Sequence, residues 1–542
     1  MKHRLITLSL ALLLILSGCG AKPAQQETVG NTPSADRIVR IAESGAPVID
    51  PAVGSDSASV EVFVNIYDTL VFPTSSGEPA PSVAESWETS PDGLTWTFHI
   101  REGVKFHSGN PLKASDVAYS LHRLIDIGEG YAYLFSNRIA SAEAIDDQTL
   151  VITLNNTYGP FLSTLCRVYI LEEAVVEANL AEGPYGEHGD YGKNYLLTHD
   201  AGSGPYMTQE VAIQESYKAT RFDDYWNGFG ENAPEGFEII NQAEAATIRS
   251  MMSNRQIDIS DSWQTEASIT ALDAIDGIDV NTYMTGHLMY MMLNTQSAPT
   301  DDIHFRKALS YCLDYETIQT IFPGSQVPNG PISSVLAGWN ADLPEVKQDL
   351  DKAREELAQS KYADDLDSHP VTLYWVTDVP DEEKLALLLK QNAAEIGITV
   401  EVKSVPWASF VDLVATVEDT PNITIVHVDP YYDEAGSVLE SKYHSSSTGT
   451  WEQAEWLCSD EIDAAIEDAI ATTDYAARME KYGEIQKELV DLAPSIFLYD
   501  AAAKRAYQDY LVWPAAEAHK NGEPFTATAG YDLYIRDFQY VS

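Results

Sequence analysis

The spacing of apolar and polar residues predicts a chain in which strands and helices alternate irregularly. Apolar residues alternate with polar ones in IVRIAESGAPVIDPAV (38–53), as in a half-buried strand, whereas VEVFVNIYDTLVF (60–72) has the spacing of an amphipathic helix. Further helical patterns occur in RKALSYCLD (306–314), KLALLLKQNAAEIG (384–397) and YAARMEKYGEIQKELVD (475–491). This mixture favours an α/β or α+β architecture.

A hairpin followed by a helix is predicted near residue 100. In WETSPDGLTWTFHIREGVKFHSG (87–109), Asp92-Gly93 separates two alternating runs and closes a hairpin. Ser115-Asp116 then predicts the N-terminal cap of a helix through VAYSLHRLI (117–125).

The first 36 residues predict an export signal and a tether. The uncharged run from Leu5 to Leu16 follows a basic start and is shorter than the roughly 20 apolar residues that span a bilayer. It ends in Leu16-Ser17-Gly18-Cys19, which resembles a bacterial lipobox, where the cysteine thiol is lipidated and the peptide is cut before it. We expect residues 1–18 to be a lipoprotein signal peptide, Cys19 to carry the lipid anchor, and residues 19–36 to form a flexible tether. An ordinary secretory signal that is cut nearby is the alternative.

The charge of the chain excludes some partners. There are 33 Lys and Arg residues against 83 Asp and Glu residues, a formal net charge of −50. Such a chain repels phosphate backbones and anionic lipid surfaces, so we expect no nucleic-acid partner. Besides Cys19 there are Cys166, Cys312 and Cys458. Their spacing excludes a dense disulfide framework but leaves one bridge among the three open.

Six stretches spread along the chain carry a family resemblance. They are ESWETSPDGLTWTFHIREGVKFHSGNPLKASDVAYSLHRL (85–124), GSGPYM (202–207), DDYWNG (223–228), IRSMMSNRQIDIS (248–260), LNTQSAPTDDIHFRKALSYCLD (293–314) and AARMEKYGEIQKELVDLAPSIFLY (476–499). In this order they resemble the large bacterial solute-binding proteins of dipeptide, oligopeptide and nickel import systems.

The resemblance implies a two-lobed, type II periplasmic-binding-protein fold of the large three-domain α/β subclass, with the ligand cleft between the lobes. Carried onto this chain, domain I would combine 37–84, 201–288 and 506–542. Domain II would be 85–200, and domain III, the second lobe, would be 289–505. A two-segment hinge would join the lobes, which close over the ligand.

The resemblance also implies a function. The protein would be the lipid-anchored, extracytoplasmic substrate-binding lipoprotein of an ABC importer. It would capture a solute, with short peptides as the leading class, and deliver it to a membrane permease driven by separate ATPase subunits. We expect a monomer without catalytic residues and without a cofactor or bound metal.

Two segments are expected to hold an extended ligand by its backbone, as an added strand would. By resemblance they are Ser55-Asp56-Ser57 in the first lobe and Ile425-Val426-His427 in the second. The first is a polar loop and the second ends the apolar strand ITIVHV (423–428). A plain solvated turn is the alternative for the first segment.

Three side chains are further candidates for ligand contact. Asp429 stands where the family's acidic residue meets a peptide's ammonium group, and a buried carboxylate needs such a cation. Trp407 matches a position that lines the pocket, and Tyr133 lies in a loop that approaches the cleft in relatives. The alternatives are an Asx-type turn at Asp429, core packing at Trp407 and plain surface at Tyr133.

The chain departs from the peptide-binding pattern at the carboxylate end. The expected basic residues are replaced by Ile423 and Val414, and Arg138, Arg167 or Arg306 would have to substitute.

Two other ligand classes and one other function are compatible with parts of the sequence. An oligosaccharide would stack its rings on Trp407 and nearby tyrosines, and a metal chelate or haem is a further alternative. A hydrolase is disfavoured because the chain lacks HExxH, GxSxG and Walker motifs.

Overall fold

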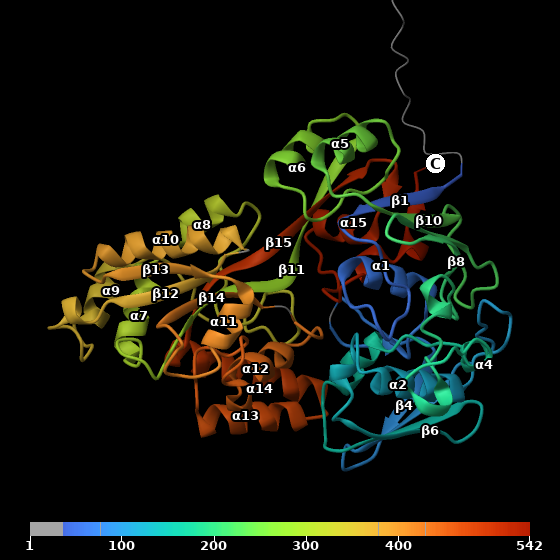
Figure 1. Cartoon of the computed structure of the whole chain (residues 1–542), viewed down its shortest axis with the longest axis horizontal. Helices are drawn as coiled ribbons and strands as arrows, with labels where there is room; N and C mark the ends of the chain where they lie inside the picture. Colours follow the sequence, from blue (N-terminus) through green and yellow to red (C-terminus); the bar gives the residue numbers. More distant parts are fainter. Residues whose placement is uncertain (1–35, 76, 378, 429, 542) are drawn as a thin grey trace, which may run out of the picture.

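The protein has two lobes, seen side by side in Figure 1. The computed structural model describes residues 36–75, 77–377, 379–428 and 430–541. The predicted signal peptide, most of the tether, Cys19 and Asp429 lie outside the described residues. Within the described residues, no helix combines the length and the hydropathy that crossing a membrane requires. The domain boundaries stay predictions, and we use their names below for the corresponding chain segments.

Domain I is built on a four-stranded sheet in the order β1 (Ile38–Glu43), β10 (Gly236–Asn241), β9 (Ser216–Arg221) and β8 (Tyr206–Ala212). The first pair is parallel and the other pairs are antiparallel. Its helices are α1 (Ser57–Ile66), α5 (Ala245–Ser253), α6 (Glu266–Asp273) and α15 (Pro514–Lys520), and short ladders join β2 (Val71–Phe72) to β3 (Ala80–Pro81) and β16 (Leu511–Val512) to β17 (Gln539–Tyr540).

Helix α1 differs from its prediction at both ends. It begins three residues early because the Asp56 carboxylate accepts the Ser59 backbone N–H at 3.1 Å. It ends at Ile66 rather than Phe72. Two residues beyond, Asp68 is buried and accepts hydrogen bonds from Ser203 and Tyr225, both at 2.9 Å, contacts that a continued helix would not reach.

Domain II contains an antiparallel sheet in the order β4 (Ala84–Thr89), β5 (Thr95–Ile100), β7 (Thr149–Leu154) and β6 (Ile139–Ala144), together with α2 (Ala114–Ile127), α3 (Phe161–Thr164) and α4 (Glu173–Ala178). The hairpin predicted at Asp92-Gly93 is confirmed, with Gly93 in the left-handed region at φ 70°. The predicted cap of α2 was wrong. Lys113 is the cap, and its N–H donates to Asp116 in the first turn at 2.9 Å.

Domain III contains a five-stranded sheet in the order β13 (Val400–Val405), β12 (Val371–Val376), β14 (Ile423–Val428), β11 (Ile278–Leu293) and β15 (Ser495–Gln508). Its helices are α7 (Ile303–Cys312), α8 (Tyr315–Ile321), α9 (Leu350–Leu357), α10 (Pro380–Ala394), α11 (Trp407–Leu413), α12 (Ala435–Tyr443), α13 (Asp460–Ala471) and α14 (Tyr475–Leu492). Ile423 and Ile425 of β14 pack in the core with α7 and α10, whereas Val426 and Val428 pack in the core shared with α12 to α14.

Two long strands, β11 and β15, cross from one lobe to the other (Figure 1). They pair with each other on both sides of an interruption, where three residues of β11 between Met284 and Leu288 face Ala501 alone. Gly286 in this bulge has φ 84°, and a Cβ there would lie 3.3 Å from Pro430. On the domain I side, Arg505 of β15 is buried beside Glu43 at 2.6 Å and Glu61 at 2.5 Å.

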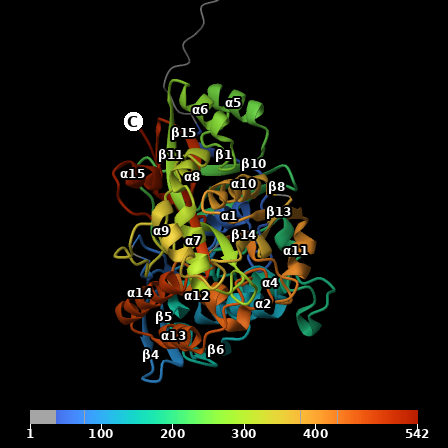
Figure 2. The ribbon, with the colours of Figure 1, turned by 90° about the vertical axis from the view of Figure 1, so that its left-hand side faces the viewer.

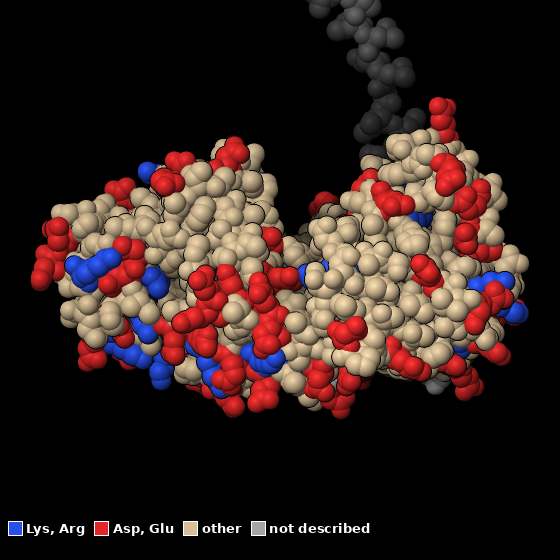
Figure 3. All heavy atoms as spheres, turned by 90° about the horizontal axis from the view of Figure 1, so that it is seen from below, with Lys and Arg blue, Asp and Glu red and all other residues tan. Residues whose placement is uncertain are grey.

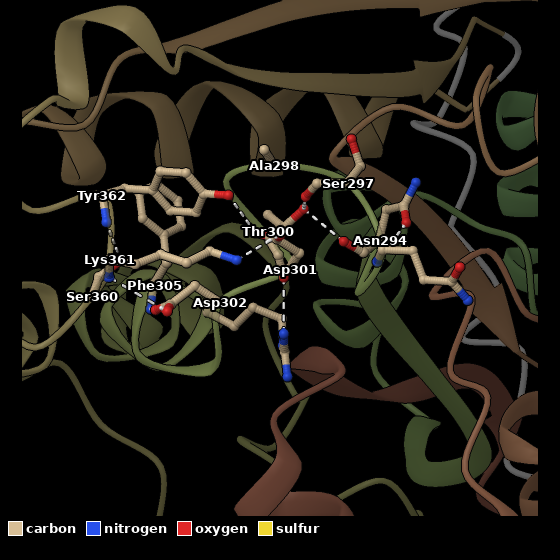
Figure 4. Close-up of polar contacts among 12 residues, drawn as sticks. Asn294, Ser297, Ala298, Thr300, Asp301, Asp302, Phe305, Ser360, Lys361 and Tyr362 are labelled. Carbon is tan, nitrogen blue, oxygen red and sulfur yellow. Dashed lines mark hydrogen bonds and ion pairs between the residues drawn. The ribbon is translucent and has the colours of Figure 1, made fainter.

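Polar side chains fix the connection between β11 and α7 (Figure 4). Thr300 donates to the Asn294 carbonyl at 2.7 Å, and the Asp302 carboxylate caps α7 by accepting the Phe305 N–H at 2.9 Å. Asp301 accepts from Tyr362 at 2.7 Å. Thr300, Asp301 and Asp302 of the LNTQSAPTDDIHFRKALSYCLD stretch are therefore engaged in structure within domain III.

Candidate functional site between the lobes

The lobes also contact each other away from the crossing strands. Both ribbon views place α13 and α14 beside domain II (Figures 1 and 2), and the surface view shows a notch between the lobes beside the contact, with acidic side chains dense on the second lobe next to it (Figure 3). The Gly159 N–H of domain II donates to the Ile470 carbonyl at 2.6 Å. A Cβ on Gly159 would lie 2.1 Å from the Thr472 carbonyl oxygen, so the contact requires glycine.

A buried ion pair lies at the centre of this contact. Arg478 of α14 donates two hydrogen bonds of 2.9 Å to the two oxygens of Glu434, and neither side chain is exposed to solvent by more than a few per cent. Ser163 of domain II donates to the same carboxylate at 2.5 Å. Glu434 is therefore engaged with Arg478 and is excluded as the anchor for a ligand amine.

Asp433 is held by domain I. Its carboxylate accepts from the hydroxyls of Thr526 at 3.0 Å and Thr528 at 2.5 Å. Burial raises the pKa of Asp433 above its usual value, while the two hydroxyls and the nearby charge of Arg167 partly offset that rise. Of the acids in the stretch 429–434, Asp429 alone lies outside the described residues, and its role as amine anchor stays a prediction.

Strand β14 lies between β11 and β12 in the sheet. Along β11 it pairs over its whole length, from Ile423 with Leu293 to Val428 with Leu288. Towards β12 the ladder contains two residue pairs within the described residues, Leu373 with Ile423 and Tyr374 with Thr424. These two pairs lie at the start of β14, and the residues that follow them, Ile425 to His427, are the segment predicted to hold a ligand. The Ile425 and Val426 side chains are buried, so a ligand could reach these two residues through their backbone groups alone.

Aromatic side chains gather around the end of β14. Trp407, which is 42% exposed, packs on Phe410 and against Trp451, with both ring centroids 5.5 Å away. The Tyr431 hydroxyl, two residues beyond Asp429, donates to Glu452 next to Trp451.

Tyr133 contributes to this aromatic group from domain II. It is 52% exposed and meets Tyr431 edge to face at 5.1 Å. Two predicted residues that are distant in sequence, Trp407 and Tyr133, are thus linked through the segment that follows β14.

The loop Ser55-Asp56-Ser57 is exposed and lies beside Tyr131, whose hydroxyl donates to the Ser55 carbonyl at 3.4 Å. Both carboxylate oxygens of Asp56 are engaged with Ser59 at the start of α1. The backbone of this loop stays the predicted contact, while the Asp56 side chain has a structural role.

His427 contacts another histidine on the neighbouring strand. It lies opposite Met289 in the ladder, and its ring meets that of His287 at 5.0 Å. Among the described residues, no three His, Cys, Asp or Glu side chains gather in a way that could hold a metal ion.

Comparison with known proteins decides the family. Residues 78–450 match the bacterial extracellular solute-binding proteins, family 5. The chain belongs to this family. It is 27% identical to the probable D,D-dipeptide-binding periplasmic protein DdpA of Escherichia coli K12, over 83% of this chain and 86% of that protein. It is 26% identical to heme-binding protein A of Haemophilus influenzae, over 90% of this chain and 92% of that protein.

Solved structures confirm the predicted fold. The structure of HbpA2 from Haemophilus parasuis superposes with a TM-score of 0.78 at 22% identity, over 91% of this chain and 99% of that one. The binding protein DppA from Helicobacter pylori in complex with the peptide STSA superposes with a TM-score of 0.68 at 23% identity, over 93% and 98%. This family member thus has the two-lobed, type II periplasmic-binding-protein fold, with helices and sheets mixed, and it is an extracytoplasmic solute-binding protein.

The structure separates the three arginines that could replace the missing basic residues. All three guanidinium nitrogens of Arg306 donate to backbone carbonyls, so this residue is structural. Arg167 is buried against the Tyr131 ring and donates to the Ala529 carbonyl at 3.1 Å. Arg138 lines a cavity, which is described below.

Several residues of this candidate site could not be identified from the sequence. Tyr431, Trp451 and Glu452 carry no motif, and only the folding of the 445–456 loop onto the end of β14 brings them together. The disulfide left open is absent from the described residues, because Cys166, Cys312 and Cys458 are all free thiols.

Proposed function

We propose that this protein is the substrate-binding component of an ABC importer and that it captures short peptides. The observation that carries the proposal is the meeting of aromatic side chains from both lobes at the end of β14, where Tyr133 of domain II contacts Tyr431 and Trp407 packs against Trp451. An extended peptide bound there would lie along β14 and use its backbone groups as a further strand does, whatever its side chains.

The surroundings of the end of β14 suit a peptide. Tyr133, Tyr431 and Trp407 present exposed or half-buried rings that can pack ligand side chains at low entropic cost. Asp429 would receive the ligand's ammonium group directly after the strand, and the loop Ser55-Asp56-Ser57 would contact the ligand from the first lobe. Relatives named for peptide binding, such as the dipeptide-binding protein of E. coli K12 at 23% identity, favour the same ligand class.

The remaining parts of the proposal concern delivery. The lobes would close over the ligand, and the closed form would be presented to a permease driven by separate ATPase subunits, without catalysis by this chain. Cys19 would carry the lipid and residues 19–36 would let the folded body stand clear of the membrane. Metabolic labelling with a radioactive fatty acid, compared with Cys19→Ala, tests the anchor: label retained by the variant would contradict it.

Native mass spectrometry of residues 20–542, purified without added ligand, tests the peptide proposal. We expect adducts that fragment into amino-acid residues. A single hexose-based or metal-chelate mass would refute it. Asp429→Asn then tests the anchor, because affinity for peptides with a free amine should fall while affinity for N-acetylated peptides should not change.

A further inference from the structure

A cavity in domain II opens beside the site described above. It has a volume of about 280 Å³ and is lined by Tyr133, Asn137, Arg138, Asn156, Thr157 and Tyr158. Tyr133 also contacts Tyr431 across the lobes, so the cavity adjoins the segment that follows β14. Its lining combines one cation with amide, hydroxyl and phenol groups, and it contains no carboxylate. This composition suits an anion rather than an apolar side chain.

Arg138 is held in a fixed orientation at this cavity. Its guanidinium lies over the face of the buried Tyr158 ring, 3.7 Å from the centroid. One of its terminal nitrogens donates to both carboxylate oxygens of Glu440 in domain III, at 2.9 Å each. The side chain is 30% exposed, which keeps it accessible from solvent. Ring and carboxylate together fix the plane of the guanidinium.

The contact with Glu440 leaves part of the guanidinium available. An arginine carries five N–H donors, and both bonds to Glu440 come from the same terminal nitrogen. Nε and the other terminal nitrogen therefore present three further donors in a planar fork, the geometry that matches a carboxylate.

We propose that Arg138, held between Glu440 and the face of Tyr158, receives a carboxylate of the bound ligand in this cavity. The inference rests on the proposed function, since it supplies the carboxylate contact that Ile423 and Val414 cannot make. A ligand would then be bound at both ends, with its ammonium group near the end of β14 and its carboxylate in domain II. Glu440 has the opposite effect: its negative charge opposes that of the ligand and weakens the attraction.

The test compares Arg138→Gln and Glu440→Gln with wild type, using alanine peptides of two to five residues as free acids and as C-terminal amides. We expect Arg138→Gln to weaken binding of the free acids about 10- to 100-fold and to leave the amides unchanged. Glu440→Gln should tighten binding of the free acids about two- to fivefold. An amidated peptide with one glutamate side chain distinguishes an acidic side chain from the chain terminus as the source of the carboxylate.

A matched ion pair provides the control. Lys193 and Glu129 of domain II are 2.8 Å apart and similarly exposed, but they do not line the cavity. Lys193→Gln and Glu129→Gln should change neither peptide series. If Arg138 and Glu440 only link the lobes, both of their variants will weaken acids and amides alike, and the proposal is overturned.

A non-peptide probe separates failure of this inference from failure of the peptide proposal. Glutarate and its diamide are compared by saturation-transfer NMR. If wild type binds neither peptide series but binds glutarate in an Arg138-dependent manner, the peptide proposal fails and the carboxylate site stands. If glutarate and diamide bind equally, or neither binds, the carboxylate site is refuted.

Discussion

Replacing Glu434 with Gln should destabilise the protein strongly although the side chain keeps its shape. In the native structure Glu434 receives two hydrogen bonds from Arg478 and one from Ser163, with both members of the ion pair buried. Removing one charge from a buried pair leaves the other uncompensated, which costs about 3–5 kcal/mol. Arg478 keeps bonds to the Thr472 and Thr473 carbonyls at 2.9 and 3.3 Å, so we expect about 3 kcal/mol.

Urea unfolding followed by tryptophan fluorescence measures this cost as a lowered midpoint of the transition that includes domain III. Glu484→Gln is the control, because Glu484 forms an exposed ion pair with Lys487 on the same helix and its loss should leave the midpoint unchanged. Adding Arg478→Met to Glu434→Gln should recover part of the loss, since the buried charge is then gone as well. Equal midpoints for Glu434→Gln and Glu484→Gln would refute the reasoning.

Three further outcomes are expected. Gly159→Ala should raise the radius of gyration in small-angle X-ray scattering, because its Cβ would meet the Thr472 carbonyl oxygen at 2.1 Å and force the lobes apart; an unchanged radius would contradict this. Asp200→Asn should cost about 2 kcal/mol of unfolding free energy, most clearly between pH 4 and 6.5 in urea titrations. Burial opposes ionisation of Asp200, but the His107 charge and hydrogen bond outweigh it and lower the pKa of Asp200 to about 2, so its stabilisation is present above pH 4 and lost as the pH falls towards 2. Burial opposes protonation of His107, but the Asp200 carboxylate outweighs it and raises the pKa of His107. The stabilisation from the protonated imidazole is therefore lost as the pH rises from 6.5 through this raised pKa. A difference in unfolding free energy between wild type and Asp200→Asn that does not vary with pH would argue against this ion pair. Trp407→Ala should lower the urea midpoint modestly, since the residue is 42% exposed but packs on Phe410 and Trp451, and it should weaken peptide binding in calorimetry; unchanged affinity would remove Trp407 from the site.

Local patterns predicted local structure well where no distant partner intervened. The hairpin at Asp92-Gly93 depends on neighbouring residues, and it forms as expected. Helix α1 ends early for a different reason: Asp68 makes hydrogen bonds to Ser203 and Tyr225, residues more than 130 positions away, and no window of sequence around it contains them. Tertiary contacts override helix periodicity at that point.

The candidate site likewise has a part that the sequence predicts and a part that only the structure shows. Trp407, Tyr133 and the end of β14 could be named from family resemblance, yet their connection through Tyr431 and Trp451 could not. The sequence also could not show which of the acids in the stretch 429–434 are engaged in structure. The structure engages Glu434 with Arg478, 44 residues further on, and a partner at that separation leaves no signature in a single sequence.

The interrupted ladder between β11 and β15 has a mechanical consequence. The two strands form a paired ribbon that we expect to bend most easily where residues 285–287 face Ala501 alone. A second register shift follows between Met289 and Tyr290, so we expect lobe movement to bend the ribbon within this short stretch. Gly286 in the bulge lies against Pro430, which is two residues beyond the end of β14. A peptide added to β14 as a further strand would therefore lie close to this bulge, where a small backbone displacement changes the orientation of a whole lobe.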